Sequence, residues 1–141
     1  MSTCSDPVIR DLWHPIFNLS ELAGTGMKQT RLLGEPIVCG IDDRGRLAAF
    51  RLVGGLSHDV PGAKQESLPV KEHLGYIWTS LGSPAEEIFS IPEANEPDRT
   101  NMNGFSVGVA CSAPRAIENF LDVAHFPYVH SGILGVEPHT E

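Results

Sequence analysis

The sequence has 141 residues, a formal net charge of −8 at pH 7 and an isoelectric point near 5.1. Apolar residues make up 41% of it and charged residues 20%, which is typical of a soluble globular protein and not of a disordered or fibrous chain. The negative charge argues against nucleic acid or an anionic lipid surface as the main partner, because both would be repelled.

The sequence contains no evident signal for a membrane or for export. No apolar stretch approaches the roughly 20 residues that a membrane-spanning helix needs, and the first ten residues lack the apolar core of a secretory signal. We therefore expect a cytoplasmic protein. Cys4, Cys39 and Cys111 are odd in number and widely spaced, so we expect reduced thiols and no disulfide framework.

The first half of the chain is predicted to form short β-strands separated by turns. Apolar segments of strand length lie at residues 12–15, 30–33, 36–41, 46–50 and 74–80. Asp42 to Gly45 has the chemistry of a hairpin turn. Residues 51–66 follow the period of neither a strand nor a helix and are predicted to be a loop. We expect a small antiparallel β unit over residues 8–84.

The second half is predicted to follow a linker at residues 85–103, which is rich in proline and charged residues. Residues 104–111 alternate apolar side chains, and this alternation predicts a half-buried strand. Ser112 and Pro114 offer the start of a helix, and residues 115–126 have the strongest helical pattern in the chain. The fold class that these elements predict is α+β.

Three polar residues are spaced by three within the predicted helix. Asn119, Asp122 and His125 would lie on one face, each about 60° from the last, and would need partners if buried. His130 would point roughly 140° away from His125 on an unbroken helix, but a kink at Pro127 would bring the two rings together. Two convergent imidazoles beside a carboxylate suit a metal such as Fe(II). The alternative is one buried, hydrogen-bonded histidine and one surface histidine.

The stretch ENFLDVAHFPYVHSGILG at residues 118–135 resembles the mononuclear-iron segment of the Rieske non-heme iron oxygenases, especially their aromatic-ring and O-demethylase branch. The resemblance covers the pattern Asn-x2-Asp-x2-His-x4-His and its flanking residues. It implies that His125 and His130 are two ligands of a facial triad on Fe(II). It also implies that Asp122 is catalytic, bonding a ligand histidine and relaying an electron from the cluster of a neighbouring subunit, and that Asn119 lies near the iron.

The resemblance extends into the first half of the chain. Residues 13–15, 31–38, 43–50 and 68–78 look like scaffold strands of the family's Rieske domain. The family resemblance implies that residues 104–141 begin a helix-grip catalytic domain. It implies dioxygen-dependent hydroxylation or O-demethylation of an aromatic small molecule, with electrons from a reductase or ferredoxin, in a homotrimer.

The sequence departs from the family at the iron–sulfur cluster. A Rieske 2Fe-2S cluster is held by Cys-x-His and Cys-x2-His pairs, and the sequence contains neither. The loops that carry these pairs are predicted to be missing around residues 51–61. His58 and His73 have no adjacent cysteine and are expected at the surface.

The third iron ligand of the family, a carboxylate, is also not identified. Glu137 and Glu141 are poor candidates, because nothing in the sequence fixes them near His125. Two functions therefore remain open. One is a truncated oxygenase subunit that holds mononuclear Fe(II) weakly and is inactive alone. The other is a non-catalytic remnant, or an assembly or regulatory piece, that docks on an intact oxygenase.

Overall fold

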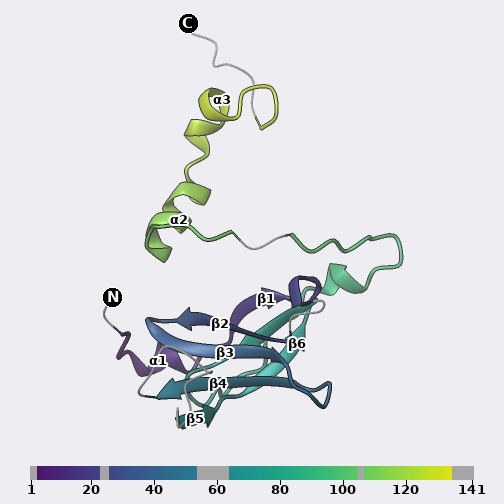
Figure 1. Cartoon of the computed structure of the whole chain (residues 1–141). Helices are drawn as coiled ribbons and strands as arrows, with labels where there is room; N and C mark the ends of the chain where they lie inside the picture. Colours follow the sequence, from purple (N-terminus) through teal and green to yellow (C-terminus); the bar gives the residue numbers. More distant parts are fainter. Residues whose placement is uncertain (1–2, 23–25, 54–63, 105–106, 135–141) are drawn as a thin grey trace, which may run out of the picture. The chain divides into compact units, whose positions relative to one another are not determined.

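The computed structural model describes residues 3–22, 26–53, 64–104 and 107–134 (Figure 1). The chain divides into two compact units, Met1–Ser106 and Val107–Glu141. The first unit is built from antiparallel sheets and the second contains short helices, so the α+β prediction is confirmed. Within the described residues, no helix has the length and apolar character needed to cross a membrane.

The first unit contains two antiparallel sheets (Figure 1). The three-stranded sheet has the order β1–β7–β6, with bounds His14–Asn18, Tyr76–Thr79 and Val70–His73. The four-stranded sheet has the order β2–β3–β4–β5, with bounds Met27–Leu32, Glu35–Ile41, Leu47–Val53 and Lys64–Ser67. Three short helices complete the unit: α1 at Pro7–Arg10, η1 at Leu19–Leu22 and η2 at Pro92–Asn95.

The predicted hairpin at residues 36–50 is confirmed, because β3 and β4 pair from Ile41 and Leu47 outward. Asp42 closes the turn, accepting hydrogen bonds at Oδ1 from the backbone N–H groups of Arg46 at 2.8 Å and Arg44 at 2.9 Å. These bonds, the one from the Arg46 backbone most of all, lower the pKa of the Asp42 carboxyl. Gly45 takes the φ of +73° that the turn requires.

Two further hairpins turn through a Leu-Gly pair. Leu33 and Gly34 join β2 to β3, and Leu74 and Gly75 join β6 to β7, all four with positive φ. Positive φ at both central residues is the conformation of a type I′ turn, which matches the twist of antiparallel strands. Leucine adopts this conformation at a steric cost, so a Leu-Gly pair is a weak turn signal in a sequence.

The core lies largely on the four-stranded sheet. Its buried residues are Leu32, Ile37, Cys39, Ala49, Leu68 and Leu81. Burial raises the pKa of the Cys39 thiol to about 12, so the group is a neutral apolar side chain at ordinary pH. All three cysteines are free thiols.

One shielded carboxylate joins helix α1 to the four-stranded sheet. Glu35 on β3 forms ion pairs with Arg10 of α1 and with Arg51 of β4, and the three side chains are 15%, 21% and 25% exposed. The Glu35 hydrogen bond raises the pKa of Arg10. Arg51 Nε lies 3.0 Å from Glu35 Oε2 without the alignment of a hydrogen bond, whereas Arg51 Nη2 donates to the Leu81 carbonyl at 2.7 Å.

The second unit contains α2 at Ala113–Leu121, η3 at Val123–His125 and α3 at Phe126–Val129. The predicted start of the helix is confirmed, since Pro114 lies in the first turn of α2. The strand predicted at residues 104–111 is wrong for Gly104 and Val107–Cys111, which are exposed and unpaired; residues 105–106 lie outside the described part of the chain. An alternating pattern forms a strand only where a neighbouring strand pairs with it.

The ion pairs of Glu35 generate a stability prediction. Glu35→Ala leaves two partly buried guanidinium groups without their carboxylate, and we expect it to lower the free energy of unfolding by about 1–3 kcal/mol. Urea unfolding followed by tryptophan fluorescence measures this, because both tryptophans, Trp13 and Trp78, lie in the first unit. Glu72→Ala, at an exposed position of β6, is the control. Equal destabilisation by the two variants would contradict the role assigned to Glu35.

Candidate metal site

The backbone breaks at Asp122, and this break shapes the candidate site. The Asp122 N–H donates to the Glu118 carbonyl as the last bond of α2, and the backbone then extends at φ −79° and ψ 90°. Asp122 Oδ1 accepts the N–H of Ala124 at 3.0 Å and so caps η3. The α-helix predicted over residues 115–126 therefore ends at Leu121, five residues early.

The kink expected at Pro127 is wrong in position. Pro127 lies in the first turn of α3, where its missing N–H would have no helical partner in any case. The helix ends earlier because the Asp122 side chain accepts the backbone N–H of Ala124, in competition with a helical carbonyl. This bond ends α2 before the chain reaches Pro127.

Both histidines follow this break and lie close together. The ring centroids of His125 and His130 are 5.4 Å apart, with an angle of 62° between the rings. His125 Nδ1 lies 3.5 Å from Asp122 Oδ2, and the His125 side chain is 21% exposed. The Phe126 ring contacts both imidazoles edge to face, at 4.9 Å from His125 and 5.9 Å from His130.

These side chains surround an open hollow of about 750 Å³, which we call the histidine hollow. Its lining residues are Arg115, Glu118, Asn119, Asp122, His125, Val129 and His130. All four predicted site residues, Asn119, Asp122, His125 and His130, thus line one hollow. Sequence reasoning missed Arg115 and Glu118, although their spacing to Asn119 and Asp122 places all four on one helical face.

The spacing of the two imidazole rings is compatible with a shared metal ion. A metal-bound imidazole nitrogen lies about 2.0–2.1 Å from the metal, so two rings on one metal have centroids roughly 4.5–5.5 Å apart. The separation of 5.4 Å falls in this range. Because Nδ1 of His125 faces Asp122, Nε2 is the nitrogen left to bind a metal.

The third ligand is not among the residues that the structure describes. No group of three His, Cys, Asp or Glu side chains in that part of the chain is placed to hold a metal. Glu137 and Glu141, the carboxylates weighed from the sequence, lie outside the described residues.

The described residues do not fit a Rieske cluster. Such a cluster needs two thiolates, and Cys39 is a buried neutral thiol in the core. His73 is engaged elsewhere, with its Nε2 2.8 Å from the carbonyl oxygen of Phe89. His58 lies outside the described residues.

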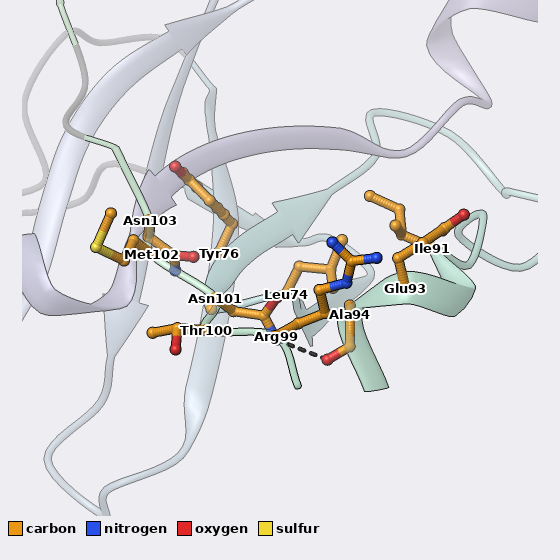
Figure 2. Close-up of a pocket in the computed structure, with 11 residues that line it drawn as sticks. Leu74, Tyr76, Ile91, Glu93, Ala94, Arg99, Thr100, Asn101, Met102 and Asn103 are labelled. Atoms are coloured by element: carbon orange, nitrogen blue, oxygen red, sulfur yellow. Dashed lines mark hydrogen bonds between the residues drawn. The ribbon is translucent and has the colours of Figure 1, made fainter. Parts of the chain in front are cut away.

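A separate hollow of about 820 Å³, lined by both polar and apolar side chains, lies in the first unit (Figure 2). The turn at Leu74 and Gly75 forms one side of it, and residues 91–103 form the other. Arg99 Nε donates to Glu96 at 2.9 Å, and Asn101 Nδ2 donates to the Ala94 carbonyl at 2.6 Å. Arg99 and Asn101 are therefore already engaged by partners within the chain, and no set of three metal-binding side chains gathers here among the described residues.

Comparison with known proteins finds sequence relatives of this chain. The family model of the vanillate O-demethylase oxygenase C-terminal domain matches residues 109–141. The probable methylxanthine N7-demethylase NdmC of Pseudomonas sp. (strain TJI-51) is 38% identical over 131 residues, or 93% of this chain. Aminopyrrolnitrin oxygenase PrnD of Pseudomonas fluorescens is 32% identical over 74 residues, or 50% of this chain.

The chain belongs to the Rieske-type oxygenases. It corresponds to part of their alpha subunit, since it spans 43% of the length of NdmC and 20% of that of PrnD. Among solved structures, the reduced oxygenase–ferredoxin complex of carbazole 1,9a-dioxygenase aligns with a TM-score of 0.38 and 17% identity, over 64% of this chain and 33% of that one. A structural similarity this weak does not establish a relationship, so the family assignment depends on the sequence relatives.

The two oxygens of Asp122 generate a prediction about metal affinity. Asp122→Asn can still accept the Ala124 N–H but loses the charge beside His125, so we expect divalent-metal affinity to fall by about 10 to 100-fold. Asp122→Ala also loses the cap and is expected to bind more weakly still. Calorimetric titration with Ni²⁺ measures both, with Asp98→Asn in the first unit as the control. Wild-type affinity in Asp122→Ala would show that the cap does not position His125.

Proposed function

We propose that the chain carries part of the mononuclear Fe(II) site of an oxygenase that demethylates a small ring compound. The observation that supports this most directly is the convergence of His125 and His130 beside Asp122, in the segment matched by the O-demethylase family model. The matched family and NdmC are both named for removing a methyl group from a ring substituent or ring nitrogen. A methylated aromatic or heteroaromatic compound is therefore the proposed substrate class.

The reaction consumes dioxygen and two electrons. Oxidation of the methyl group with O₂, two electrons and two protons gives the demethylated ring compound, formaldehyde and water. The bound iron would supply the activation of dioxygen. The residues of this chain would supply two imidazole ligands, and Asp122 would hold His125 in the tautomer that leaves Nε2 free.

The electrons are proposed to come from another polypeptide. The sequence has no Cys-x-His or Cys-x2-His pair, so a ferredoxin, a reductase or a neighbouring cluster-bearing subunit would be the donor. The Asp122 side chain is 58% exposed, which leaves it accessible to such a donor. Assembly as a trimer and a cytoplasmic location stay predictions, as does the proposal that the protein is a shortened oxygenase.

A second candidate function is docking on an intact oxygenase without catalysis. The second unit exposes many apolar side chains, among them Phe120 at 82%, Leu121 at 75% and Ile133 at 84%. Exposed apolar surface of this extent marks interaction sites in soluble proteins. Catalysis would require His125 and His130, whereas docking would not, so substitutions of these histidines distinguish the two functions.

An activity assay tests the proposal. The Fe(II)-loaded chain is incubated with vanillate or an N-methylated xanthine, NADH and a reductase, with and without a Rieske-type ferredoxin, and formaldehyde is measured. We expect no formaldehyde without the ferredoxin, formation with it, and loss in His125→Ala, with His73→Gln as the control. Formation without a cluster-bearing donor would contradict the proposed electron source. If no formaldehyde forms in any condition and the chain binds an intact oxygenase, the result would favour the docking function over catalysis.

A further inference from the structure

A second hollow in the first unit is lined by aromatic rings. It has a volume of about 490 Å³, and Trp13, Trp78 and Phe89 form its aromatic walls. Trp78 on β7 and Phe89 pack edge to face, with ring centroids 5.9 Å apart. Trp78 is almost fully buried whereas Phe89 is 60% exposed, so the hollow has a fixed floor and an accessible rim. We call it the aromatic hollow.

Both indole N–H groups are already used within the chain. Trp13 Nε1 donates to the Glu86 carbonyl at 3.0 Å, and Trp78 Nε1 donates to the His73 carbonyl at 2.9 Å. These bonds fix the orientation of the two rings. A ligand in the aromatic hollow would therefore be recognised by ring faces, which carry negative electrostatic potential and attract cations.

The charges at the rim have the same sign as the ring faces. Asp11, Glu86 and Glu87 line the aromatic hollow, and no basic residue lines it. Asp11 Oδ1 accepts the N–H of Ser83 at 2.9 Å. The Glu86 carboxylate forms no ion pair in the described part of the chain. Aromatic faces beside carboxylates are the chemistry that recognises organic ammonium groups.

A lysine side chain of the protein already makes both kinds of contact, with an aromatic face and with a carboxylate. The Lys71 ammonium lies over the Trp13 ring, 5.1 Å from its centroid, and forms an ion pair with Glu87. Lys71 extends from β6, and its side chain is 40% exposed. An internal cation thus covers one ring face and neutralises one carboxylate of the aromatic hollow.

We propose that the aromatic hollow binds small organic cations of the alkylammonium class, and that they displace the Lys71 ammonium from Trp13 and Glu87. Quaternary ammonium groups suit the site because they carry charge without needing hydrogen-bond acceptors, and both ring N–H donors are occupied. This site lies in the first unit and uses none of the residues of the histidine hollow.

Tryptophan fluorescence tests the proposal directly, because both tryptophans of the sequence line the aromatic hollow. The probes are choline and an uncharged alcohol in which a tert-butyl group replaces the trimethylammonium group, with sodium chloride controlling for ionic strength. We expect a saturable change with choline and roughly 3- to 30-fold weaker binding of the alcohol.

The variants make the test specific. Lys71→Met removes the internal competitor and is expected to tighten choline binding several-fold, whereas Lys64→Met, on exposed strand β5, is expected to leave it unchanged. Phe89→Ala and Glu86→Gln are expected to weaken it.

Three results would overturn the proposal. Equal affinity for choline and the alcohol would show that the hollow binds apolar groups without selecting the positive charge. The absence of a saturable change with choline would remove the site. Binding of a lysine-rich peptide without binding of choline would assign the hollow to a protein partner instead.

Discussion

The backbone break at Asp122 is the constraint on which the arrangement of the second unit depends. One oxygen of its carboxylate caps η3 by accepting the Ala124 N–H, and the other lies 3.5 Å from His125 Nδ1. The same side chain therefore ends α2, redirects the chain and orients an imidazole. His125 and His130 both follow the break, as the last residue of η3 and the C-cap of α3, and their ring centroids lie 5.4 Å apart.

The first unit closes a β scaffold around a core that has no cluster ligands among its described residues. Cys39, which lies on β3, is a neutral core side chain, and the β6–β7 connection is a two-residue turn at Leu74 and Gly75. The unit is held by local hairpins and by the ion pairs of Glu35, and none of these needs a metal. This architecture is consistent with the proposal that the electrons for an oxygenase reaction come from another polypeptide.

Sequence patterns predicted the features that depend on neighbouring residues. The hairpin at Asp42 to Gly45 followed from turn chemistry, and the grouping of Asn119, Asp122 and His125 followed from spacing, whereas His130 was expected to join them only through a kink at Pro127. The family resemblance added the metal identity. The strand predicted at residues 104–111 was wrong because an alternating pattern cannot supply a pairing partner. The predicted kink was misplaced because the prediction considered Pro127 and not the capping side chain of Asp122. The aromatic hollow was not predictable, since tertiary packing joins α1 and the segment after it to β7 and to residues 85–89.

The central claim is that His125 and His130 bind one metal ion through their imidazoles. Pulsed electron paramagnetic resonance of the chain loaded with Cu²⁺ counts coordinated imidazoles by the coupling of their remote nitrogens to the electron spin. The account predicts two equivalent imidazoles in the wild type and one in each of His125→Ala and His130→Ala. A single imidazole in the wild type, or a spectrum unchanged in the double variant, would contradict it.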